Sequence, residues 1–450
     1  MSAVMEDRDI YLSTFERFEK GRDRHERPWL HRIRSAAIDR FAELGFPTPR
    51  DEEWRFTNVA PITRVPFRPA AAVELSGQAV QALRRLAFDS GDAGTRIVFV
   101  NGFYAAGLSV FRPSGGVTVE NLAAALEANP QRLEPYLAQH AGYDDHPFRA
   151  LNTAFLRDGA FVSIPKGEVV REPIHLVFVS IARGEPAVSH PRNLIVTGPG
   201  SQATIVESYI GLDEGVYLTN AVTEIVAGEN SLLDHYKLQR EGGKAFQVAT
   251  LQVHQGRGST FSSHYVSLGG GLVRNEVNVV LDGEGCESTL NGLYLARDRQ
   301  HMDNRTVIDH ARPRCASHEL YKGILDGRAH GVFNGKIFVR QDAQKTDAKQ
   351  TNKTLLLSDD ATINTKPQLE IFADDVKCTH GATVGQLDAE SIFYLRSRGI
   401  DLESARSLLT FAFANDVIGR IKVEPLRAGL EELLLATQHL PLGEQAKEVP

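Results

Sequence analysis

Cysteine, tryptophan and methionine are scarce in this chain of 450 residues, which contains only three, two and three of them, respectively. Three cysteines are too few for the disulfide framework of a secreted protein, so we expect a reducing, cytoplasmic environment. No run of about 18 apolar residues occurs, so no membrane-spanning helix is expected. The N-terminal residues carry charges throughout, which is unlike the apolar stretch of a secretory signal.

Familiar catalytic and nucleotide-binding motifs are also missing. The chain has no G-x-x-x-x-G-K-[ST] sequence, which excludes a P-loop, and no G-x-S-x-G, H-E-x-x-H or C-x-x-C sequence. The formal net charge is −7, and no long lysine or arginine run occurs, which argues against nucleic acid as a partner. We therefore expect a protein that is not an enzyme and that acts through other proteins.

Short runs rich in valine, isoleucine and threonine fill the chain from about residue 160, and glycine-rich turns separate them. Five of these turns end in a small residue, at spacings of 30, 28, 27 and 29 residues: Ser201, Ser231, Ser259, Cys286 and Cys315. A turn that recurs at a nearly constant period is typical of a β-solenoid, because each coil stacks on the next. A sandwich or a barrel is the competing all-β interpretation.

The chain divides into three segments by pattern. Residues 1–155 are predicted to be mainly helical, residues 156–384 to form the solenoid, and residues 385–450 to be helical again. In the last segment Asp388 and Asp401 are expected to cap two amphipathic helices, and a third begins near Pro425. These helices either dock a partner or cap the open end of the solenoid.

The most informative local motif is Cys378-Thr379-His380, where the strand pattern ends. Residues two apart in a strand point to the same side, so this thiol and this imidazole could face one metal, and both suit iron or zinc. Two ligands do not complete a site, so a partner chain would supply the rest.

Cys286 and Cys315 stand where earlier turns have serine, which favours a structural role for them. The polar run 342–353 is either a solvated coil edge or a polar interface.

Several long motifs resemble the SufB/SufD family. They are DDVKCTHGATVG at residues 374–385, QTNKTLLLS at 350–358, PQLEI at 367–371 and FYLRSRGI at 393–400, together with DEEWRFT at 51–57. The version HGATVGQLD at residues 380–388 is similar to the SufD branch of the family rather than to the SufB branch.

The resemblance implies a right-handed parallel β-helix between helical segments. It also implies a scaffold subunit of the SUF iron–sulfur cluster assembly complex, working with SufB and with the ABC-type ATPase SufC. His380 and Cys378 would then be candidate ligands of a nascent Fe–S cluster shared with SufB, which the isolated chain would not hold stably. The C-terminal helices, with Arg396 and Arg398, would dock SufC, and the chain alone could form a homodimer.

Two alternatives remain. A SufB-like paralogue would carry the cluster itself, although three cysteines depart from the more cysteine-rich SufB pattern. A β-helical enzyme acting on polysaccharides would use clustered carboxylates and is commonly secreted, neither of which this sequence indicates.

Overall fold

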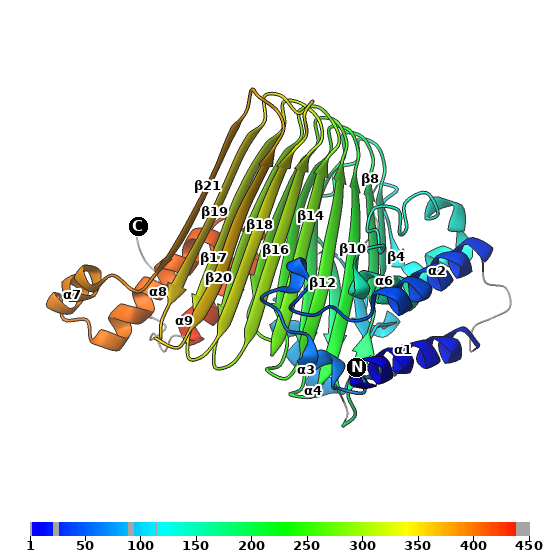
Figure 1. The fold of residues 1–450 in the computed structure, drawn as a ribbon, viewed down its shortest axis with the longest axis horizontal. Helices are drawn as coiled ribbons and strands as arrows, with labels where there is room; N and C mark the ends of the chain where they lie inside the picture. The colour runs from blue at the N-terminus through cyan, green and yellow to red at the C-terminus, as the bar shows by residue number, and fades with distance from the viewer. Residues whose placement is uncertain (1, 21–26, 89–93, 113–114, 183, 438–450) are drawn as a thin grey trace.

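The computed structural model describes residues 2–20, 27–88, 94–112, 115–182 and 184–437. Two sheets, whose strands are parallel except at β3 and β4, stack coil upon coil along one axis (Figure 1), which confirms the predicted β-helix between helical segments. Sheet A runs in the order β20-β18-β16-β14-β12-β10-β8-β5-β4, and β7 and β1 join it at β10; sheet B runs β21-β19-β17-β15-β13-β11-β9-β6-β2-β3. From β8 onward, therefore, the even-numbered strands lie in sheet A and the odd-numbered strands lie in sheet B.

The strands of sheet A are β1 (Arg68–Pro69), β4 (Thr118–Asn121), β5 (Ala160–Ile164), β7 (Ala187–Ser189), β8 (Arg192–Thr197), β10 (Tyr217–Ala227), β12 (Phe246–Gln255), β14 (Leu272–Leu281), β16 (His301–His310), β18 (His330–Val339) and β20 (Thr362–Ile371). Those of sheet B are β2 (Thr95–Val100), β3 (Phe103–Tyr104), β6 (Ile174–Ser180), β9 (Gln202–Gly211), β11 (Leu232–Arg240), β13 (Thr260–Ser267), β15 (Glu287–Ala296), β17 (Ala316–Leu325), β19 (Asp347–Leu356) and β21 (Lys377–Gly385).

The helices are α1 (Ser2–Lys20), α2 (Pro28–Leu44), α3 (Ala60–Thr63), α4 (Gly77–Leu86), α5 (Leu122–Ala128), α6 (Pro147–Ala154), α7 (Ala389–Ser397), α8 (Leu402–Ile418) and α9 (Glu424–Thr437), with short 3-10 turns at Glu52–Trp54, Ala106–Leu108 and Pro130–Arg132. Strands β2 and β4, which lie within residues 1–155, extend the two sheets. The division of the chain at residues 155 and 384 stays a prediction.

The recurring glycine turns form one corner of the solenoid, between a strand of sheet A and the next strand of sheet B. Ser201, Ser231 and Ser259 each donate a hydrogen bond to the carbonyl oxygen three residues earlier, at 2.7, 2.8 and 2.7 Å. The thiol of Cys286 makes the same contact with Gly283 at 3.1 Å. The corner thus uses a small donor side chain to satisfy a carbonyl group that the turn leaves out of the strand ladder.

The N-terminal helices pack on the outer face of sheet A. Aromatic side chains from this segment, among them Phe41 and Trp54, form one buried cluster with Leu218, Val248 and Leu272 of β10, β12 and β14. Figure 1 shows α1 and α2 as neighbouring helices at this side of the molecule. The N-terminal segment therefore shares its core with the solenoid instead of forming a separate globule.

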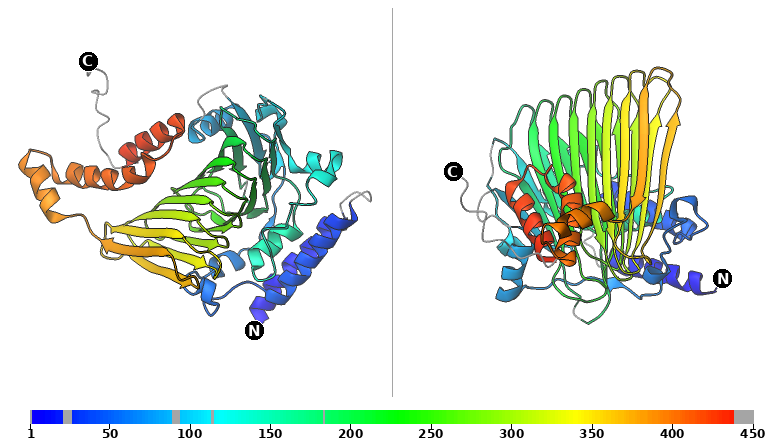
Figure 2. Two further views of the ribbon diagram at one scale, coloured as in Figure 1. Left: turned by 90° about the horizontal axis from the view of Figure 1, so that it is seen from above. Right: turned by 90° about the vertical axis from the view of Figure 1, so that its left-hand side faces the viewer.

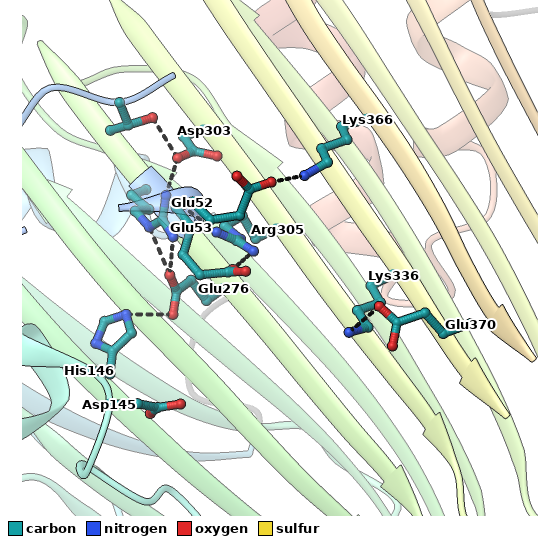
Figure 3. Close-up of polar contacts among 12 residues, drawn as sticks. Glu52, Glu53, Asp145, His146, Glu276, Asp303, Arg305, Lys336, Lys366 and Glu370 are labelled. Carbon is teal, nitrogen blue, oxygen red and sulfur yellow. Dashed lines mark hydrogen bonds and ion pairs between the residues drawn. The ribbon is translucent and has the colours of Figure 1, made fainter. Parts of the chain in front are cut away.

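Residues 51–57, which we call the Trp54 strap, cross the outer face of sheet A towards its last coils (Figure 3). Lys366 of β20 forms an ion pair with Glu52, and Arg305 of β16 forms one with Glu53. The guanidinium group of Arg274 lies 3.6 Å from the ring centroid of Trp54.

The same strap ends on a hydrogen-bond network. The hydroxyl of Thr57 donates to Asp303 at 2.6 Å and lies 2.9 Å from the Nε2 atom of His301. Asp303 in turn is paired with the buried Arg274. The strap thus contacts β14, β16 and β20 at the same time, on the outer surface of the β-helix.

The C-terminal helices α8 and α9 lie across the outer face of sheet B. Their side chains Val417, Ile418 and Leu430 are buried in one cluster with Leu293 and Ile324 of the sheet. Lys322 of β17 is paired with Asp416 of α8 at 2.8 Å. These two helices therefore cover a face of the solenoid. The alternative that they cap its open end is wrong for α8 and α9.

Candidate functional site

The open end of the solenoid is formed by β20 and β21, the last strands of their sheets. Every residue of β21 is exposed except the half-buried Cys378. Large apolar side chains are exposed at this end: Ile371, Phe372 and Val384 have 38%, 59% and 46% of their surface accessible. Unpaired strand edges with exposed apolar side chains are a ready template for another chain. We call this surface the open end.

Cys378 and His380 lie on the inner side of β21. Cys378 is the register partner of Ala348, and His380 is the partner of Gln350; both partners are buried. The side chain of Cys378 packs against a small apolar cluster that includes Ile337 and Val339, and its burial raises the pKa of the thiol. His380 is exposed. The expected shared orientation is therefore present, and the ligand role stays a prediction.

These two side chains can supply only part of a coordination sphere. Among the described residues, no group of three or more histidine, cysteine, aspartate or glutamate side chains is arranged to hold a metal ion. A tetrahedral iron or zinc site needs four ligands. Any cluster bound at the open end would therefore take its remaining ligands from another molecule.

Cys286 and Cys315 lie at the glycine corner, just before β15 and β17, which are three and two coils before β21, and both are fully buried. Ser259, Cys286 and Cys315 occupy successive equivalent positions of the stack, because their strands pair in register. The sulfur atoms of Cys286 and Cys315 both contact the carbonyl oxygen of Gly283, at 3.1 and 3.2 Å, respectively.

Replacing both corner cysteines by serine should leave the protein folded, because serine makes the equivalent contact in earlier coils. We expect Cys286→Ser with Cys315→Ser to change the free energy of unfolding by about 1 kcal/mol or less per site. Urea unfolding followed by circular dichroism measures this change. A folded double variant that has lost its biological activity would instead indicate that these thiols handle sulfur.

Helix α7 projects away from the rest of the molecule at the end of the ribbon (Figures 1 and 2). Asp388 caps it by accepting a hydrogen bond from the backbone of Ser391 at 2.8 Å, as predicted. None of its residues is buried, and Phe393 and Tyr394 have 74% and 58% of their surface exposed. Arg398 lies over the ring of Tyr394 at 5.1 Å. An exposed aromatic pair beside arginine is the composition expected of a protein interface.

The polar run 342–353 was predicted to be a solvated coil edge or a polar interface, but part of it lies inside the solenoid. Strand β19 alternates, so that Ala348, Gln350, Asn352 and Thr354 are buried inside the solenoid. Gln350 contacts Glu319, which is also buried. These buried residues lie at every second position, starting from the apolar Ala348. That alternation is the sequence signal that could have identified the inward positions.

In its described residues the molecule is thus a parallel β-helix whose last strands are left uncovered, with a projecting helix, a form suited to contacts with other proteins. No helix in the described part of the chain is long and apolar enough to cross a membrane. Residues 179–413 match the family described as "SUF system FeS cluster assembly, SufBD core domain", and residues 5–176 match the "SufBD protein N-terminal region". The chain belongs to the SufBD family of the SUF iron–sulfur cluster assembly system.

Curated relatives share this assignment along most of their length. An iron–sulfur cluster assembly SufBD family protein of Synechocystis is 36% identical over 409 residues, which is 89% of each chain. The iron–sulfur cluster assembly protein SufD of Escherichia coli is 32% identical over 410 residues, 90% of this chain and 92% of the relative. The SufD protein of Bacillus subtilis is 26% identical over 94% of this chain and 96% of its own. The predicted similarity to SufD is therefore confirmed.

Proposed function

We propose that this chain is a non-catalytic scaffold subunit that works beside SufB and the ATPase SufC in the cytosol to build and deliver nascent Fe–S clusters. The observation that carries the proposal is the open end, where exposed strand edges, exposed apolar side chains and a cysteine–histidine pair coincide. A partner with the same β-helical fold would present equivalent edges, so the two could pair there. The cluster is cargo in this proposal, held between the two chains.

The cysteine inventory favours this role over that of a self-sufficient cluster carrier. Two of the three thiols are buried at the corner, and only Cys378 is near a surface. Iron–sulfur clusters are held mainly by cysteine thiolates, so this chain would lack ligands on its own. A cluster that assembles and persists on the isolated chain would overturn the scaffold assignment in favour of the SufB-like alternative.

The projecting helix α7 is the surface we assign to SufC. It leads directly from β21, which carries Cys378 and His380, so a movement of the ATPase could be transmitted to those side chains. Arg396 is exposed on this helix, and Arg398, which is also exposed, follows directly at its C-terminal end. The chain has no P-loop, so ATP hydrolysis belongs to the partner in this proposal.

Reversing the charge of these arginines should weaken SufC binding. We expect Arg396→Glu with Arg398→Glu to lower the recovery of SufC in a pull-down by about tenfold, because interface arginines are frequent hot spots. SufB should still be recovered, since its contact is through the strand edges. A thermal melt checks that the variant is folded.

A matched control is available on helix α4. Arg84 and Arg85 are also exposed, and Arg84→Glu with Arg85→Glu makes the same change of charge on another helix. This control should bind SufC normally. If both double variants lose SufC equally, the effect is one of net charge and α7 is not the docking surface.

A further inference from the structure

Three inward-facing side chains follow one another in register along sheet B as it approaches the open end. Glu319 of β17 pairs with Gln350 of β19, and Gln350 pairs with His380 of β21. Glu319 and Gln350 are buried, with 4% and 2% of their surface exposed. Neighbouring strands are about 4.8 Å apart, so the Gln350 amide is the inner-face group directly beneath His380.

The Gln350 amide is held in one orientation. Its Nε2 atom donates to the Oε2 atom of Glu319 at 2.7 Å. On the facing sheet, Gly335 of β18 leaves the space that this amide occupies, because a Cβ atom there would lie 2.3 Å from the Nε2 atom. Burial raises the pKa of Glu319 to about 7, so above that pH Glu319 is a carboxylate that can only accept, and it takes the nitrogen end of the amide.

The oxygen end of the Gln350 amide lacks a hydrogen-bond partner among the described residues. This Oε1 atom is buried. An unpaired buried acceptor costs free energy, so it calls for a donor. The neighbouring inner position behaves differently, because Asn352 uses both ends of its amide, towards Tyr321 and Thr365.

A histidine that binds a metal through one ring nitrogen needs an acceptor for the N–H of the other nitrogen, because that bond fixes the tautomer and the ring orientation. Gln350 offers such an acceptor on the rung next to His380. The Oε1 atom of Glu319 is also unpaired among the described residues, but it lies one strand further from His380.

We propose that Gln350 is a positioning residue for His380: its Oε1 atom accepts the N–H of one ring nitrogen and turns the other nitrogen towards the open end. Glu319 acts one step further back, because it holds the amide of Gln350 in the required orientation. This positioning role is useful only if His380 is a ligand, as proposed above. The hydrogen bond between Gln350 and His380 can nevertheless be tested without a metal.

The test is the tautomer of His380 in the isolated full-length chain. The protein is labelled with ¹⁵N-histidine, the signals of His380 are assigned with His380→Gln, and the ring nitrogen shifts are read at about pH 8.5, where an ordinary histidine is neutral. A hydrogen bond of normal strength should favour one tautomer by about tenfold. Gln350→Met, which has a similar length and only a weak sulfur acceptor, should return the two tautomers to the ratio of a free neutral histidine side chain.

Two further variants separate positioning from packing. Asn352→Leu disturbs an equally buried amide that does not face His380, so it should leave the tautomer unchanged. The exchange Glu319→Gln with Gln350→Glu reverses the lower hydrogen bond but keeps an acceptor beneath His380, so it should restore a single tautomer. If Gln350→Met does not fold, Gln350→Asn serves, because its shortened amide withdraws from the histidine.

The outcomes are distinguishable from those of the proposed function. If His380 keeps the same tautomer in Gln350→Met as in the unaltered chain, the positioning role is wrong, whatever the cell-based activity of His380 variants. If the tautomer responds to Gln350 while His380→Ala supports normal cluster assembly, the positioning geometry stands and the ligand role fails.

Discussion

His380→Ala should lower the activity of iron–sulfur enzymes by about tenfold or more in a strain that depends on this SUF system, a loss of the size seen when metal ligands or their supports are removed. The variant should fold and assemble normally, because His380 is exposed and its loss removes at most the one hydrogen bond proposed to Gln350. Activity of an iron–sulfur reporter enzyme, measured beside the amount of purified complex, gives both quantities. Cys378→Ala should have a milder effect, since SufB would supply the essential thiolate.

His318→Ala is the matched control for this experiment. His318 lies in β17 of the same sheet and is also exposed, but it is not at the open end. It should behave like the unaltered chain. Normal reporter activity with His380→Ala, or an equal loss with His318→Ala, would remove the ground for treating His380 as a ligand.

Trp54→Ala should cause the largest loss of stability among the substitutions considered. Trp54 has 4% of its surface exposed, packs against Phe148 with ring centroids 5.4 Å apart and covers the buried Arg274. Removing a buried aromatic side chain typically costs about 3–5 kcal/mol, and here it also uncovers a buried cation. Urea unfolding monitored by circular dichroism measures the change.

The second tryptophan supplies the comparison. Trp29 of α2 is only partly buried, so Trp29→Ala should cost clearly less than Trp54→Ala. Hydrogen exchange of residues 51–57 should also rise in Trp54→Ala, because the strap loses its anchor. Equal losses of stability in the two variants would show that the strap contributes nothing beyond ordinary aromatic burial.

The sequence predicted the features that repeat or that depend on local chemistry. The spacing of the corner residues identified the β-helix because every coil needs the same turn, and Asp388 and Asp401 marked the starts of α7 and α8 because an N-cap side chain acts within three residues. The shared orientation of Cys378 and His380 followed from the period of two in a strand.

Features set by distant parts of the chain were not predictable in this way. An amphipathic pattern shows that a helix has an apolar face but not what that face covers, so the packing of α8 and α9 on sheet B could not be foreseen. The polarity of Gln350 pointed to solvent, whereas its partner Glu319 and the space left by Gly335 place it inside. The partners of the Trp54 strap on β14, β16 and β20 lie more than 200 residues away in the sequence.

The strap changes how the end of the solenoid can open. In a stack where each coil contacts only its neighbours, the terminal coil frays first, because it has only one neighbouring coil. The ion pair between Glu52 and Lys366 joins the last strand of sheet A to a segment near the start of the chain. Fraying of that strand must therefore also break a contact with the N-terminal segment, which couples the terminal coil to a part of the protein that is distant in sequence.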